Sequence, residues 1–263
     1  MPQNHMPGQE RVEGFLAEWS ASVSHRFPND IDFILLFGSA ARGEFHRGHS
    51  DVDLIIQTRN DAAIPAVDSF ALKEFWRLDR KWGTGLREFC SIGRPRDAFD
   101  SVVKAIEASV RLYKPFEVIG PDTVDWKNGR GVRPDLLWEG ELLGSQLSLF
   151  YKIKKEGKVL YGRDVLSGLH PHRSWWEKFK MLIIPQHLAF VGLFVSPLLP
   201  AKGVAYCCKS VLWAMEGALI ARRRFALERQ KQPGLLKHEF ANLLPQTAVF
   251  NWNRFLADMG VRA

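Results

Sequence analysis

Two aspartates one residue apart, Asp51 and Asp53, open an apolar run in the segment SDVDLII. Side chains at i and i+2 lie on the same face of a strand, so a strand here would bring both carboxylates together. Two ionised carboxylates at close range repel each other unless a cation lies between them. Mg²⁺ prefers carboxylate oxygens and keeps positions open for substrate phosphates. The pair therefore predicts a site for one or two Mg²⁺ ions in phosphoryl or nucleotidyl transfer.

The dipeptide Gly38-Ser39 follows the apolar run IDFILLF and fits the same chemistry. Glycine lets a backbone approach a phosphate closely. Ser39 offers a hydroxyl and a backbone N–H, and a helix beginning here would direct its positive end at anions. Arg42 adds a charge-assisted donor. We predict that Gly38, Ser39 and Arg42 bind the nucleotide.

A third carboxylate, Glu88, stands in the apolar segment GLREFCSI, where it alternates with Leu86 and Cys90. If this strand lies beside residues 52–58, Glu88 faces the aspartates and binds metal or takes a proton from an attacking hydroxyl. Each motif alone also fits a plain turn or a solvated strand edge. Their joint arrangement favours a catalytic site.

The hydrophobic pattern predicts the elements that must position these residues. Strands are expected at Ile31–Phe37, Val52–Thr58, Leu86–Ile92, Phe116–Ile119 and within 158–166, and helices at 9–25, 66–81, 97–112 and 135–155. After His172 the chain is expected to be wholly helical. Alternating strands and helices followed by helices alone predict an α/β (α+β) domain with a short mixed sheet, then an all-helical C-terminal domain. We place the two domains at residues 1–167 and 168–263.

The chain of 263 residues carries a net charge of +7, and its positive charge is concentrated near the C-terminus. Residues 168–263 hold 13 Lys and Arg against 5 Asp and Glu. Such an excess favours an anionic partner, although a domain that helps to hold a triphosphate would also be basic.

Cysteine content and hydropathy bear on the cellular compartment. Three Cys, two of them adjacent, form no disulfide framework, and the N-terminus lacks an apolar signal segment, so a cytoplasmic location is expected. Residues 182–200 are uncharged and nearly long enough to span a bilayer. They contain three prolines and several polar residues, so we expect a buried helix and a turn, with no membrane association.

The segment GSAARGEFHRGHSDVDLII resembles the signature of the DNA polymerase β-like nucleotidyltransferase superfamily. It is most similar to the minimal nucleotidyltransferases and the aminoglycoside adenylyltransferases, and the resemblance extends to about residue 60. It implies that Asp51 and Asp53 bind Mg²⁺ and that Gly38 and Ser39 contact the phosphates. It also implies that Glu88 is a third carboxylate, which serves as the base.

A second resemblance lies in GKVLYGRDVLSGL, residues 157–169. It is similar to the segment that leads into the helical C-terminal domain of the aminoglycoside enzymes, a bundle that closes over nucleotide and acceptor. This resemblance implies that Lys209 and Lys237 supply phosphate contacts.

The function predicted from these features is Mg²⁺-dependent transfer of NMP from an NTP, expected to be ATP, to an acceptor hydroxyl. The acceptor is a small molecule of aminoglycoside type, RNA such as a tRNA end, or a partner protein, as in protein-adenylylating antitoxins. A polycationic drug calls for acidic residues, and in the C-terminal part these are outnumbered by Lys and Arg. Trp175 and Trp176 could stack on nucleic acid, but we favour a core position for both. The alternative class is a non-catalytic module that binds nucleic acid or a partner.

Overall fold

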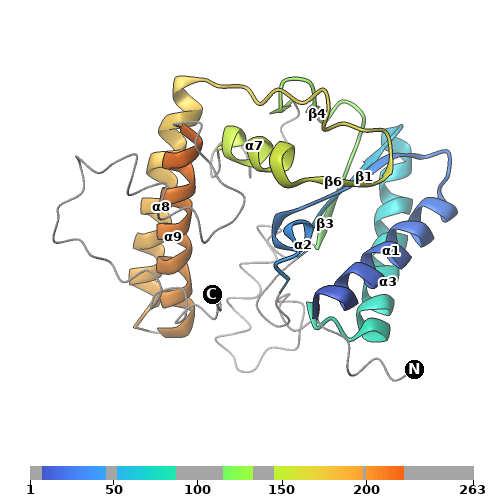
Figure 1. Ribbon diagram of the computed structural model, residues 1–263, viewed down its shortest axis with the longest axis horizontal. Coiled ribbons are helices and arrows are strands. Elements are labelled where there is room, and N and C mark those ends of the chain that lie inside the picture. The colour runs from blue at the N-terminus through green and yellow to red at the C-terminus, as the bar shows by residue number, and fades with distance from the viewer. Residues whose placement is uncertain (1–7, 46–51, 87–114, 133–144, 198–199, 222–263) are drawn as a thin grey trace. The chain divides into compact units, whose positions relative to one another are not determined.

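The computed structural model describes residues 8–45, 52–86, 115–132, 145–197 and 200–221 (Figure 1). The chain divides into two compact units: Met1–Val124 with Lys152–Leu169, and Asp125–Tyr151 with His170–Ala263. Residues 125–151 thus group with the C-terminal helices, whereas the sequence suggested a single boundary after residue 167. That boundary stays a prediction.

The sheet of the first unit has four strands in the order β3-β2-β1-β6. The central strand β1 (Ile31–Phe37) pairs antiparallel with β2 (Asp53–Thr58) on one side and with β6 (Lys158–Gly162) on the other. Strand β3 (Phe116–Ile119) pairs parallel with β2, so the sheet is mixed. This mixed sheet confirms the predicted fold class.

Two amphipathic helices of this unit, α1 (Gly8–Arg26) and α3 (Ile64–Trp82), pack against each other (Figure 1). Each buries apolar residues spaced three or four apart, the period of a helical stripe. These residues are Val12, Phe15, Leu16, Trp19 and Val23 in α1, and Val67, Ala71, Phe75 and Leu78 in α3. The predicted helices 9–25 and 66–81 are therefore confirmed, each slightly longer than expected.

An aromatic cluster ties these helices to the sheet. The ring of Phe75 meets the ring of Phe15 edge-on at a centroid distance of 4.8 Å, and the ring of Trp19 lies 5.3 Å from that of Phe116 in β3. Trp19 also donates its indole N–H to the carbonyl oxygen of Ala71, 3.0 Å away. Aromatic rings from both helices thus anchor strand β3, which pairs with β2.

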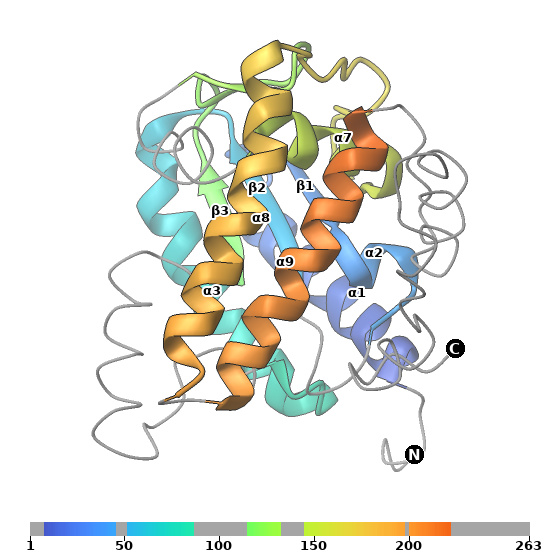
Figure 2. The ribbon, with the colours of Figure 1, turned by 90° about the vertical axis from the view of Figure 1, so that its left-hand side faces the viewer.

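The second unit contains the helices α8 (Trp175–Val195) and α9 (Pro200–Ala221), which lie side by side (Figure 2). A Cβ atom on Gly203 would lie 2.8 Å from the carbonyl oxygen of Gly192, so the two backbones approach closely. The described residues also include a two-stranded sheet of β4 (Val124–Asp125) and β5 (Arg130–Gly131), and the helix α7 (Gln146–Glu156). The helix α7 overlaps the predicted range 135–155 and ends one residue beyond it. Helices after residue 172 were predicted, and they are confirmed as far as Ala221.

Several apolar side chains of α8 are exposed, against expectation. Trp175 and Trp176 are 74% and 54% exposed, so the favoured core position was wrong for both. Leu182, Phe190 and Phe194 are exposed as well, which corrects the expectation of a buried helix after residue 182. In the part of the chain that the structure describes, no helix combines the length and apolar character needed to cross a bilayer.

Two predicted elements, the strand Leu86–Ile92 and the helix 97–112, fall almost entirely in residues 87–114, outside the described residues. They stay predictions.

Replacing Phe75 by Ala should lower the free energy of unfolding by about 3–5 kcal/mol, because Phe75 is fully buried between Phe15 and Trp19. Urea denaturation followed by circular dichroism measures the change. Lys73→Ala on the exposed side of the same helix is the control and should stay within about 0.5 kcal/mol of the wild type. A similar small loss for Phe75→Ala would contradict this description of the core.

Candidate functional site

The predicted Gly-Ser corner lies directly after β1, where the chain forms the five-residue helix α2 (Gly38–Arg42). Gly38 has a φ of +78°, in the left-handed region that favours glycine. The helix ends at Gly43, which is also left-handed, and the amide of Glu44 donates to the carbonyl oxygen of Ser39 at 3.0 Å. Glycines at both ends thus permit this tight turn.

The strand register brings Asp53 to this turn. Asp53 is the first residue of β2 and lies opposite Phe37, the last residue of β1. A Cβ atom on Gly38 would lie only 2.0 Å from the Oδ2 atom of Asp53, so the carboxylate occupies the space that glycine leaves open. Val52 and Leu54 are buried in the core, whereas Asp53 is half-buried. The structure therefore places two predicted site residues, Gly38 and Asp53, in direct proximity.

The turn also holds buried donors that lack a partner. Among the described residues, neither the hydroxyl of Ser39 nor the Nη2 atom of Arg42 has a hydrogen-bond partner, and both atoms are buried. An unsatisfied buried polar group costs free energy and needs an explanation. A ligand that brings oxygen atoms, such as a phosphate, would satisfy both donors.

Arg42 is held by two carboxylates. Its Nε atom lies 2.8 Å from Oε2 of Glu44, and its Nη1 atom forms an ion pair with Oε2 of Glu156. The other oxygen of Glu156 accepts the backbone N–H of Gly38 at 3.1 Å. Burial alone would lower the pKa of Arg42, but the negative charge of Glu156 and the bond to Glu44 raise it above its usual value. Arg42 is therefore firmly cationic in this position.

Glu156 was not identified from the sequence. It is the last residue of α7 and lies 118 positions after Gly38, so nothing in the local pattern links the two. The available signal was indirect: an acidic residue before Gly157, at the end of an amphipathic helix and directly before a strand.

The remaining predicted residues are only partly described. Asp51, Glu88 and Lys237 lie outside the described residues, and Lys209 lies in α9 with no description of its side chain. Along Leu54–Gln57, β2 is paired with β1 on one edge and with β3 on the other. Residues 87–92, whose position beside β2 was the condition for the role of Glu88, lie outside the described residues.

The donor set fits a magnesium ion as far as it is described. Among the described residues, Asp53 brings a carboxylate oxygen, the kind of ligand that Mg²⁺ prefers, next to the turn that holds the hydroxyl of Ser39. Among described residues no three His, Cys, Asp or Glu side chains gather into a metal cluster. Two of the three predicted ligands, Asp51 and Glu88, lie outside that set.

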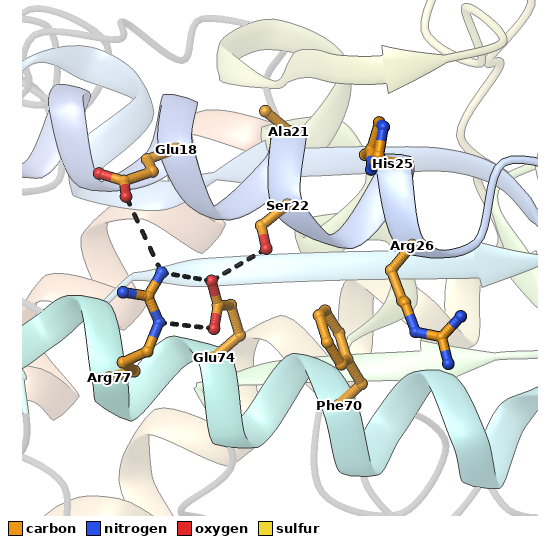
Figure 3. A pocket seen from close by; sticks show the side chains of 8 residues that line it. All are labelled: Glu18, Ala21, Ser22, His25, Arg26, Phe70, Glu74 and Arg77. Carbon is orange, nitrogen blue, oxygen red and sulfur yellow. Dashed lines mark hydrogen bonds and ion pairs between the residues drawn. The ribbon is translucent and has the colours of Figure 1, made fainter.

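A separate pocket of about 720 Å³ lies on the first unit between α1 and α3 (Figure 3). Its charged groups are engaged with each other: Glu74 accepts from Ser22 at 2.9 Å and pairs with Arg77 at 2.6 Å. The bond from Arg77 is the main cause that lowers the pKa of the Glu74 carboxyl. None of the predicted site residues that the structure describes lines this pocket.

Alanine at Gly38 tests the contact with Asp53, and Gly43 provides a matched control. Both glycines have nearly the same φ, +78° and +79°, but a Cβ on Gly43 meets nothing nearer than Gln9, at 4.0 Å. Gly43→Ala should cost about 1–2 kcal/mol from backbone strain alone. Gly38→Ala should cost about 1–3 kcal/mol more, because its Cβ overlaps the carboxylate. Equal losses in urea denaturation would show that Asp53 does not lie against Gly38.

Comparisons with known proteins were made for the whole chain. A comparison with curated proteins gave no match. Among solved structures, the crystal structure of the spectinomycin adenyltransferase AAD(9) from Enterococcus faecialis with ATP and spectinomycin is similar to this chain. The identity is 12%, the alignment covers 93% of this chain and 96% of that chain, and the TM-score is 0.41. We infer no substrate for this chain from a similarity of this kind.

The family comparison bears directly on the site. Residues 16–107 match the model of the nucleotidyltransferase domain, and this range contains the turn at Gly38 and all three predicted carboxylates. The resemblance predicted from the Gly-Ser and Asp-x-Asp motifs is thereby confirmed for residues 16–107.

Proposed function

We propose that this domain transfers NMP from an NTP, expected to be ATP, to a hydroxyl group of an acceptor, with release of diphosphate. One observation carries the proposal: the carboxylate of Asp53 lies against Gly38, in the turn where the hydroxyl of Ser39 is buried without a partner among the described residues. The carboxylate of Asp53, which can bind a hard cation, and the hydroxyl of Ser39, which can donate to a phosphate oxygen, thus lie at the same turn.

In the proposed reaction the acceptor oxygen forms a bond to the α-phosphorus, and the bond from that phosphorus to the bridging oxygen breaks as diphosphate leaves. Asp53, together with Asp51, would hold Mg²⁺. When bound, the metal neutralises charge on the phosphates. The hydroxyl of Ser39 would donate to a phosphate oxygen, and the Nη2 group of Arg42 is a further donor. Glu88 would take the proton of the attacking hydroxyl.

The two lysines predicted in the C-terminal part belong to the proposal as predicted contacts of the triphosphate. Lys209 in α9 and Lys237 would place positive charge near the triphosphate. Their part in the proposal rests on the family resemblance and on the basic composition of residues 168–263.

Replacing Asp53 by Asn should reduce nucleotidyl transfer on the order of 100-fold or more, because the amide has the same shape but no negative charge for the metal. Transfer of label from α-labelled ATP to an acceptor in a cell extract, with and without EDTA, measures the effect. Asp32→Asn is the control, since Asp32 lies on β1 and pairs with Arg163 at 2.7 Å. Wild-type activity in Asp53→Asn, or activity that survives EDTA, would contradict the proposal.

The acceptor we favour is RNA, for two reasons. The C-terminal part is basic, which disfavours a polycationic drug. The exposed rings of Trp175 and Trp176 each stack on Phe179, at centroid distances of 5.3 and 5.5 Å and interplanar angles of 17° and 20°. Exposed aromatic faces beside basic residues are typical of surfaces on which unpaired bases stack.

Offering the enzyme labelled NTPs with total RNA, total protein or aminoglycosides separates the acceptors. We expect label in RNA, and we expect Trp175→Ala to weaken labelling by roughly 5- to 100-fold, the range of one lost base stack. Val211→Ala, an exposed apolar position on α9, is the control and should label RNA as the wild type does. Label in protein alone would favour a protein-adenylylating enzyme. Nucleotide binding without label in any acceptor would favour a non-catalytic module.

A further inference from the structure

The most unusual buried group near the proposed site is the carboxylate of Glu156. Its side chain is only 1% exposed, and its two oxygens serve two different donors of the turn. One oxygen accepts the backbone N–H of Gly38 at 3.1 Å, and the other pairs with Nη1 of Arg42. Both donors belong to the first unit, as does Glu156 itself.

A buried carboxylate at a phosphate-binding turn needs a physical reason. Removing a carboxylate from water is costly unless an opposite charge and hydrogen bonds compensate it. Arg42, whose side chain is 10% exposed, supplies the charge, and Gly38 supplies a hydrogen bond. A negative charge here also opposes the approach of a triphosphate. The reason for this carboxylate is therefore to be sought in its contacts with Gly38 and Arg42.

The two contacts decide which donors of the turn remain for a ligand. The amide of Gly38 is already engaged by Glu156, and so is one nitrogen of Arg42. Among the described residues of the turn, the buried side-chain donors without a partner are the Ser39 hydroxyl and Nη2 of Arg42. We propose that Glu156 is a positioning residue that fixes the Gly38 turn so that Ser39, and not the Gly38 amide, contacts the nucleotide phosphates. This inference rests on the proposed function.

Glutamine is the sharpest substitution at this position, because an amide has only one oxygen. In Glu156→Gln the oxygen can satisfy either Gly38 or Arg42, and the NH₂ group then opposes the other donor. Glu44→Gln is a matched control. Glu44 also contacts Arg42, at 2.8 Å, but its side chain is 35% exposed, and the Gly38 amide donates to Glu156 instead.

Hydrogen exchange in the full-length protein, followed by mass spectrometry on peptides that contain residues 37–39, tests the positioning directly. We expect exchange in Glu156→Gln to be faster by roughly 10- to 100-fold, the range that a lost buried hydrogen bond gives. Glu44→Gln should exchange as the wild type does. Should Glu156→Gln fail to fold, Glu156→Asp keeps the charge but is one methylene shorter, and it should show a smaller increase of the same kind.

Nucleotide affinity, measured with Mg²⁺ and a fluorescent ATP analogue well below the thermal midpoint of each variant, tests the functional part. We expect Glu156→Gln to bind roughly 10- to 100-fold more weakly, as when a group that orients a ligand's contacts is removed. A merely structural role would lower the thermal midpoint but leave the affinity of the folded protein unchanged.

Three results would overturn the inference, and they differ from one another. Unchanged exchange in Glu156→Gln and Glu156→Asp would show that Glu156 does not hold the turn. Faster exchange with unchanged nucleotide affinity would show that the held turn is irrelevant to the nucleotide. A wild-type protein that binds no nucleotide would refute the proposed function, and with it the nucleotide-positioning role, while the exchange data would still report on the contact with Gly38.

Discussion

The site depends on one register. Phe37 at the end of β1 lies opposite Asp53 at the start of β2, so the carboxylate meets the turn at Gly38. Side chains alternate along a strand, and a slip of one residue would turn Asp53 towards the core and bring Leu54 out of it. The buried neighbours Val52 and Leu54 resist that slip. The hydrophobic core thus positions the carboxylate through the strand pairing.

The other elements of the first unit keep this register rigid. Strand β3 closes the second edge of β2, and Phe116 at its start packs among the rings of Trp19 and Phe75. On the far side β6 pairs with β1 and follows directly on α7, the helix that ends at Glu156. The pairing of β6 with β1 therefore brings Glu156 to the end of β1, where the turn begins.

Much of this arrangement could be predicted from local patterns. A mainly apolar run predicted β1 with its observed bounds, and helical spacing predicted α1 and α3. The motifs pointed to Gly38 and Asp53. Long-range features could not be predicted in this way. The contact between Gly38 and Glu156 joins residues 118 positions apart, and the pairing of β3 with β2 depends on a crossover. The exposure of Trp175 was missed because an aromatic residue in a helix has no local sign that separates a core position from a surface one.

The acids at the turn bear on how a nucleotide would bind in the proposed reaction. In the described part of the turn, the carboxylates of Glu44 and Glu156 both contact the guanidinium of Arg42, and Glu156 also accepts the amide of Gly38. The carboxylate of Asp53 lies against Gly38 at the same turn. Carboxylates oppose the approach of a triphosphate, and a divalent ion carried by the nucleotide reduces this repulsion. The proposed function therefore calls for a nucleotide that arrives together with its metal.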